Sequence, residues 1–222
     1  MNTKDLNTIY NQNQNSTEYD FLISEDKFQL KIKEPSTSFL EKLDSYDKKL
    51  SSYIHNLEIN CFLEYLIYIF ARMYNVDTIT SYFILTFIYF AYFYNNYTFI
   101  IRPLIHVIII LIITLLSKSF FGRKRPNENK EVIRLFNCRS YENNCSMPSG
   151  DSMQAANFAI LFLYYFGNFF GFFLVPFVMF ARIFYFCHYV FDTVIGALMG
   201  FFISYILVFS LDFLFNYFNL NI

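Results

Sequence analysis

The chain has 222 residues, of which 55% are hydrophobic and 23% aromatic, while only 16% carry a charge. The formal net charge of −1 argues neither for nor against a charged partner, and we expect no nucleic-acid partner. The apolar residues form blocks long enough to cross a hydrocarbon core, which needs about 20 residues of helix. This excludes a soluble domain, whose apolar residues would be dispersed by helix or strand period. The sequence predicts an all-α, polytopic membrane protein.

The amino-terminal part of the chain divides into two segments. Residues 1–35 are rich in Asn, Gln and Ser, and we expect a largely disordered polar tail without the features of a signal peptide. Residues 36–56 repeat apolar side chains at helical spacing, with Ser38 as a possible cap. An amphipathic helix lying on the membrane surface and an ordinary helix packed on the bundle both fit this pattern.

Six apolar segments follow between residues 57 and 216, and residues 217–222 form a short carboxy-terminal tail. We therefore expect a six-transmembrane-helix bundle. Six spans place both termini on one side of the membrane and the loops after the third and fifth spans on the other. The polar residues of these loops should then meet at one membrane face. The expected spans are, in order, about 57–74, 78–94, 98–121, 152–166, 169–187 and 189–215.

The first polar segment lies at the end of the third span, where Lys118 and Arg125 bracket Arg123 and Lys124. A guanidinium offers forked donors that suit phosphate oxygens, and a lysine contributes a compact positive charge. Cations at this position can also extend toward lipid headgroups without binding a substrate. Taken alone, the segment fits both interpretations.

The second polar segment, Pro148-Ser149-Gly150-Asp151, lies where a loop becomes the fourth helix. The free amides of a helix amino terminus bind anions, and glycine permits close approach of the backbone. Ser149 or Asp151 can equally serve as an ordinary helix cap. By itself this segment is a weak indication of a site.

The third polar segment contains Arg182, His188 and Asp192. His188 and Asp192 are four residues apart, so on one helix they would share a face, and the carboxylate would orient the imidazole. A histidine held in this way beside phosphate-binding cations is typical of a nucleophile or general base. The alternative is an interfacial histidine with an incidental acidic neighbour.

The three segments in this order, Lys-x6-Arg-Pro, Pro-Ser-Gly and Arg-x5-His-x3-Asp, resemble the tripartite motif of the type 2 phosphatidic acid phosphatase family. That family shares its helical core with bacterial acid phosphatases and vanadium haloperoxidases. The resemblance covers about residues 59–215. It implies metal-independent removal of phosphate from a lipid phosphate or diphosphate in a membrane, with no cofactor.

The resemblance also implies a role for each matching residue. His188 would attack phosphorus to form a phosphohistidine, and Asp192 would hold and charge His188. Donors arranged in advance stabilise the charge of the transition state. The phosphate oxygens would be held by Lys118, Arg125, Ser149, Gly150 and Arg182.

Two positions depart from the family pattern. The second motif usually ends in a histidine that acts as general acid, and here that position is Asp151, which becomes the candidate acid. Ala181 replaces the usual serine before the arginine of the third motif. An aspartate is mostly ionised at neutral pH and is then a poor acid. Because a diphosphate has a better leaving group than a monophosphate, we expect a preference for lipid diphosphates or for acidic pH.

Other functions remain open at the level of sequence. The same substitutions fit a catalytically silent relative that binds lipid phosphates, and a phosphohistidine can also pass its phosphate to another alcohol in a transferase reaction. An ion channel or carrier is disfavoured, because the polar residues gather at one face. No Cys and His cluster has the spacing of metal ligands.

The orientation and compartment rest on weaker signals. The cationic loop after the third span would face the cytoplasm by the positive-inside rule, but phosphate binding accounts for several of its cations. The resemblance implies an active site facing a lumen or the exterior. We expect cytosolic termini and a location in the endoplasmic reticulum or another endomembrane. Cys138 and Cys145 lie close together in this loop and are either free thiols or a disulfide of an oxidising compartment.

Overall fold

The computed structural model describes residues 39–75, 78–79, 82, 85, 98–127, 132–139 and 143–217. The expected polar tail, most of the expected second span and residues 218–222 lie outside the described residues. The chain divides into two compact units, Met1–Glu41 and Lys42–Ile222, and all contacts discussed below lie within the second unit.

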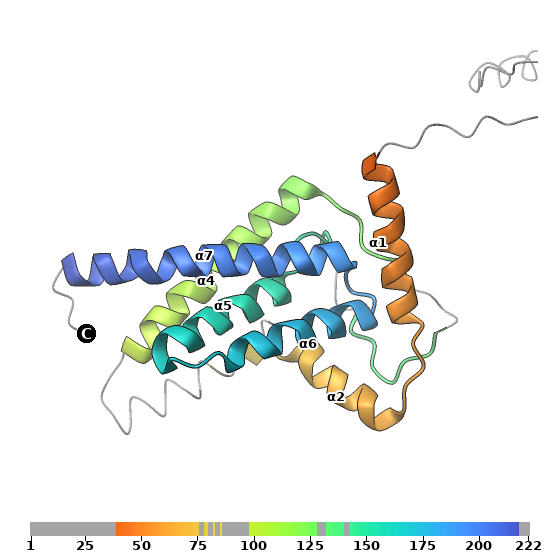
Figure 1. Cartoon of the computed structure of the whole chain (residues 1–222), viewed down its shortest axis with the longest axis horizontal. Helices are drawn as coiled ribbons and strands as arrows, with labels where there is room; N and C mark the ends of the chain where they lie inside the picture. Colours follow the sequence, from red (N-terminus) through yellow and green to blue (C-terminus); the bar gives the residue numbers. More distant parts are fainter. Residues whose placement is uncertain are drawn as a thin grey trace, which may run out of the picture. The chain divides into compact units, whose positions relative to one another are not determined.

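The described residues form helices and no strand, which confirms the all-α prediction. Each helix coincides, within a few residues, with a segment that the sequence predicts. The helices, shown in Figure 1, are α1 (Phe39–His55), α2 (Cys61–Arg72), α4 (Thr98–Phe121), α5 (Gly150–Phe166), α6 (Phe170–Phe184) and α7 (Val190–Tyr217).

Two of these helices are long and apolar enough to cross a membrane. Residues Ile101–Phe121 of α4 have a mean hydropathy of 2.4, and α7 extends over 28 residues with a mean hydropathy of 2.3. Only 28% of each apolar window is buried, so most of these side chains are at least partly exposed, unlike those of a core helix in a soluble protein. α6 is apolar but shorter, with Pro176 inside it.

The packing of the bundle depends on small residues where α5 crosses its neighbours. α5 packs mainly on α7 and α6, and also on α4 (Figure 1). A Cβ on Gly200 of α7 would collide with the Met153 carbonyl oxygen, and a Cβ on Gly171 of α6 would lie 2.8 Å from the Ala159 Cα. Small residues let helix backbones approach closely in membranes. They bring the amino termini of α5 and α7 together.

α1 has its polar face turned toward the rest of the unit. Asp47, Ser51 and His55, which share one helix face, are buried. The apolar side chains of Tyr46 and Tyr53 are 70% and 68% exposed. The helix therefore packs on its neighbours through polar groups, and its apolar residues remain available for a hydrophobic environment.

Candidate active site

A backbone hydrogen bond connects the second polar segment, at Ser149, to the third, at Asp192. Ser149 is the N-cap of α5, and its side chain accepts a hydrogen bond from the Ser152 amide. The Ser149 amide itself donates to the Asp192 carbonyl oxygen at 2.9 Å. Gly196 makes this approach possible, because a Cβ there would lie 2.5 Å from the Ser149 carbonyl oxygen.

His188 does not lie on the same helix as Asp192, contrary to the expectation from their spacing. α6 ends at Phe184, and His188 lies in the turn before α7 begins at Val190. The Asp192 carboxylate reaches back to this turn and accepts the Tyr189 amide at 2.9 Å. The His188 Nδ1 lies 3.9 Å from Asp192 Oδ2, an ion-pair distance that exceeds a hydrogen bond. The two residues are thus neighbours through a helix-capping turn.

The Asp192 carboxylate is fully buried and is held by residues from another part of the chain. Arg123 Nη1 donates to Oδ1 at 2.7 Å, and the Ser146 hydroxyl donates to Oδ2 at 2.7 Å. The sequence indicates Arg123 only as one of several cations and does not indicate Ser146. These residues precede Asp192 by 69 and 46 positions, so no local spacing reveals the contacts.

His188 lies among the cations of the first and third segments. The Arg125 Nη1 is 3.2 Å from the His188 Nε2, and both side chains are buried. Burial lowers the pKa of His188 well below its ordinary value of 6.5; Asp192 opposes this shift, while Arg125, Arg182 and Lys118 add to it. The neutral imidazole is therefore the stable form in this environment.

Asn144, which the sequence did not indicate, connects two of these cations. Its side-chain oxygen accepts a hydrogen bond from Lys118 Nζ at 2.9 Å and another from Arg125 Nη2. Arg125 also donates through Nε to the Asn144 carbonyl oxygen and through Nη1 to that of Cys187, each at 2.7 Å. Two cationic side chains can thus share one oxygen acceptor, as they would share a phosphate oxygen.

The residue at the position of the expected acid, Asp151, lies in the first turn of α5. Its Oδ2 is 2.9 Å from the Nε of Arg182, which is 2% exposed. Arg182 also donates through Nη1 to the Ala71 carbonyl oxygen. The structure therefore places a carboxylate directly against one of the predicted phosphate-binding cations.

An open cleft of about 420 Å³ lies beside Arg125 on the loop side. Its lining is cationic and amide-rich, and no carboxylate belongs to it among the described residues. In the described part of the chain, no three His, Cys, Asp or Glu side chains are grouped as metal ligands. The residues around the cleft are Gly122, Arg123, Lys124, Arg125, Arg139, Asn143, Asn144 and Cys145.

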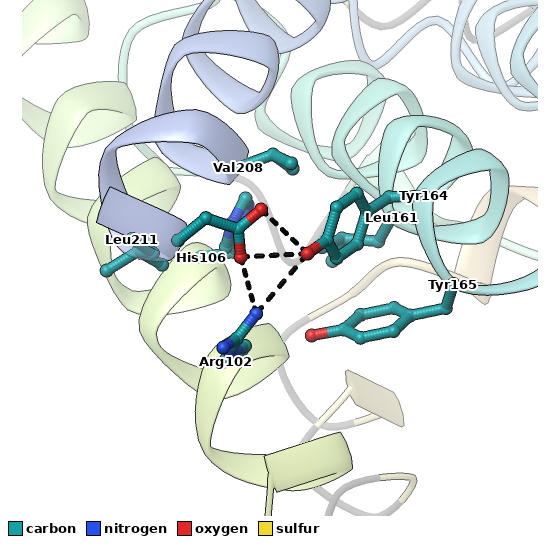
Figure 2. A pocket seen from close by; sticks show the side chains of 8 residues that line it. Arg102, His106, Leu161, Tyr164, Tyr165, Val208 and Leu211 are labelled. Atoms are coloured by element: carbon teal, nitrogen blue, oxygen red, sulfur yellow. Dashed lines mark hydrogen bonds and ion pairs between the residues drawn. The ribbon is translucent and has the colours of Figure 1, made fainter. Parts of the chain in front are cut away.

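A separate polar cluster lies on α4, α5 and α7, far along these helices from the turn that holds His188. Arg102 Nη1 is 2.5 Å from Asp212 Oδ1, and the Tyr164 hydroxyl donates to the same carboxylate at 2.7–2.8 Å (Figure 2). Nearby, the His106 Nδ1 forms a 3.1 Å hydrogen bond with the Asn157 side-chain oxygen. This cluster satisfies charges inside the bundle and contributes no residue to the His188 site.

Residues 99–214, about half of the chain, match the PAP2 superfamily. A comparison with curated proteins finds no match.

Two solved structures have a similar fold. The transmembrane PAP2-type phosphatidylglycerolphosphate phosphatase of Bacillus subtilis superposes with a TM-score of 0.63 at 15% identity, covering 77% of this chain and 87% of that one. LpxE of Aquifex aeolicus superposes with a TM-score of 0.55 at 20% identity, covering 72% of this chain and 93% of that one. The matched segment contains all three polar segments, and the chain therefore belongs to the PAP2 superfamily, whose lipid phosphate phosphatases it resembles.

Proposed function

We propose that the protein is an integral membrane lipid phosphatase that forms a phosphohistidine at His188 without a metal. The observation that carries this proposal is the position of His188. Its buried imidazole has Arg125 Nη1 at 3.2 Å from Nε2 and Asp192 Oδ2 at 3.9 Å from Nδ1, and burial lowers its pKa. A silent binding protein needs the cations but not an unprotonated imidazole among them.

The geometry favours Nε2 of His188 as the attacking atom. Nδ1 faces Asp192, and a proton on Nδ1 leaves the lone pair on Nε2, on the side of Arg125. Nε2 forms a bond to phosphorus as the bond from phosphorus to the lipid oxygen breaks. The leaving oxygen departs with the electron pair. Water then attacks phosphorus, the phosphorus–nitrogen bond breaks, and phosphate and neutral His188 are regenerated.

The transferring phosphoryl group would be held by cations and by the start of α5. Lys118 and Arg125 already share an oxygen acceptor in Asn144, which supports their assignment to phosphate oxygens. Ser149 has its amide committed to Asp192, so in this proposal it orients the first turn and Gly150 supplies the close backbone approach.

We further propose that lipid diphosphates, such as polyprenyl or diacylglycerol diphosphate, are better substrates than monophosphates. Asp151 Oδ2 lies 2.9 Å from Arg182 Nε, and a cation at this distance favours the ionised form of a carboxylate, which is a poor proton donor. A diphosphate releases a phosphate monoester, which needs less protonation than an alkoxide does. One solved structure with a similar fold is named as a phosphatidylglycerolphosphate phosphatase. A lipid phosphate is therefore the substrate against which a diphosphate should be compared.

The same proposal includes a six-span topology with α1 at the membrane surface. The two long apolar helices and the fold similarity to a transmembrane PAP2-type protein support it. The active site would face the lumen of the endoplasmic reticulum or another endomembrane, with cytosolic termini. The exposed apolar face of α1 supports its interfacial position.

The test is a phosphate-release panel on the purified full chain across lipid mono- and diphosphates. His188→Ala should reduce turnover by at least about a thousand-fold. His106→Asn serves as a matched control, because it removes a histidine that is buried outside the site. Labelled phosphate trapped on wild type, but not on His188→Ala, supports the intermediate.

Three results would contradict the proposal. Vanadate binding without turnover of any lipid phosphate would indicate a silent binding protein. Phosphate transfer to an added alcohol in preference to water would indicate a transferase. Equal turnover by His188→Ala and wild type would exclude the phosphohistidine.

A further inference from the structure

The amino terminus of α7, which carries Asp192, is capped by side chains of α1. The Val190 amide donates to the Ser51 hydroxyl at 3.0 Å, and the Phe191 amide donates to Asp47 Oδ1 at 3.0 Å. The first amides of a helix lack partners within the helix and need acceptors from elsewhere. Here the acceptors come from a helix that lies about 140 residues earlier in the chain.

Asp47 also connects to the Asp192 carboxylate through one guanidinium. Its second oxygen, Oδ2, accepts from Arg123 Nη2 at 2.7 Å, and Arg123 Nη1 donates to Asp192 Oδ1 at 2.7 Å. The Asp47 side chain is fully buried, as is that of Asp192. The guanidinium also lies over the Tyr189 ring, 4.3 Å from its centroid. The two residues before Asp192 are thus tied to α1 directly, and the Asp192 carboxylate is tied to it through Arg123.

Charge balance makes this connection sensitive to Asp47. Burial disfavours the charged guanidinium of Arg123, but Asp192 and Asp47 outweigh this effect and raise its pKa above the ordinary value. Asp44 also contacts Arg123 Nη2 at 2.6 Å, yet its side chain is 41% exposed and shared with Lys48. Asp47 is therefore the buried counter-ion that keeps Arg123 aligned between α1 and α7.

We infer that Asp47 and Ser51 of α1 are positioning residues that fix the start of α7 and, through Arg123, the Asp192 carboxylate beside His188. This inference rests on the proposed function, because it assigns these residues to the reaction at His188. It adds to that reaction a helix that lies outside the segment matching the superfamily, residues 99–214. The fold thus uses its amino-terminal helix as part of the active-site support.

The experiment compares the full-length variants Asp47→Ala, Asp47→Asn and Ser51→Ala with the control Asp44→Asn. Asp47→Ala should lower kcat about a hundred-fold, because a small displacement of a reacting group slows the reaction by about that factor. KM should change less than about threefold. Asp47→Asn keeps an oxygen for the Phe191 amide but loses the charge, so it should restore part of kcat. Asp44→Asn removes a contact to Arg123 without touching α7 and should stay within about threefold of wild type.

Hydrogen exchange on the same proteins separates positioning from general destabilisation. Amides of the peptide containing residues 189–192 should exchange about tenfold faster in Asp47→Ala and Ser51→Ala, because a helix cap is lost. Exchange in α5 and α6 should remain as in wild type. If Asp47→Ala fails to fold, Asp47→Asn and Ser51→Ala carry the test.

The inference is overturned if kcat falls no more in the Asp47 and Ser51 variants than in Asp44→Asn. It is also overturned if kcat falls while exchange at residues 189–192 is unchanged. Failure of the proposed function has a different result: wild type then turns over no lipid phosphate, and exchange still decides whether α1 caps α7.

Discussion

The Nε of Arg182 and the Oδ2 of Asp151 lie 2.9 Å apart, so a predicted phosphate-binding cation is paired with the residue at the position of the expected acid. Arg182 is 2% exposed and lies in the last turn of α6, and Asp151 lies in the first turn of α5. A fixed carboxylate at this position reduces the positive charge that a bound phosphate would meet. Under the proposed function, Asp151 should therefore weaken the binding of phosphate by Arg182 and supply little protonation to the leaving group.

Replacing Asp151 by Asn should tighten the binding of phosphate analogues. The substitution removes an anion that competes with phosphate for Arg182, and we expect the Kd of vanadate to fall about tenfold, or about 1.4 kcal/mol. Titration of the purified variant measures the effect. Asp212→Asn changes a carboxylate paired with Arg102 in the separate polar cluster and is the control. Equal affinity in Asp151→Asn and wild type would contradict the role given to the pair.

Replacing Asp151 by His should shift substrate preference toward monophosphates. An imidazolium can protonate an alkoxide leaving group, so monophosphatase turnover should rise by about a hundred-fold, within the range of general acid catalysis. Diphosphatase turnover should change much less, because its leaving group needs little protonation. The measurement is the ratio of the two rates at pH 7. A ratio that stays at the wild-type value would show that another group is the acid.

The acid limb of kcat/KM should lie well below pH 6.5. The folded pKa of His188 is lowered, chiefly by burial, so the imidazole stays neutral and nucleophilic where an ordinary histidine becomes protonated. The same shift contributes stability that is present above the ordinary value of 6.5 and is lost as pH falls through the folded pKa. Rates from pH 5 to 8, corrected for ionisation of the substrate phosphate, test this. A limb centred near 6.5 would contradict it.

Adding a methyl group at Gly200 should destabilise the bundle. A Cβ there meets the Met153 carbonyl oxygen and lies 2.9 Å from the Ala156 Cβ, so α5 and α7 must move apart. Gly200→Ala should cost about 1–3 kcal/mol in the free energy of unfolding. Leu198→Ala, on the same helix at a side chain that is 63% exposed, is the control. Thermal unfolding of both variants in the same detergent measures the effect. If Gly200→Ala were as stable as wild type, α5 and α7 would pack less tightly than the structure shows.

The loop thiols should differ strongly in reactivity. Cys138 and Cys145 are both free, and Cys138 is buried, which raises the pKa of its thiol to about 12. Cys145 is partly exposed and borders the cleft. A maleimide should therefore label Cys145 at least about tenfold faster, since the thiolate is the reactive form. Single-cysteine variants provide the comparison, and equal rates would contradict the burial of Cys138.

An impermeant reagent on sealed vesicles would then report, through Cys145, which side of the membrane the loop faces.

Much of the helical architecture could be predicted from local patterns. The third expected span, 98–121, coincides with α4, and the fourth and last differ from α5 and α7 by a few residues. Apolar composition and the polar segments at the helix ends are local properties of the chain, and they limit where a membrane helix can begin and end. The expected spans leave His188 between the last two helices, but its contacts could not be predicted, because Asp192 reaches back to the Tyr189 amide instead of sharing a helix with His188.

The order of the three polar segments was sufficient to predict the superfamily and to name His188, Asp192 and the main cations. The superfamily prediction is confirmed, because each motif is a short run of residues that can be recognised locally, while the roles of the named residues stay predictions. The partners of these residues required the tertiary structure: Arg123 and Asp47 around Asp192, and Asp151 against Arg182. Such contacts join positions 31 to 76 residues apart when helices pack. Buried charges take whichever counter-ion the packing brings within reach.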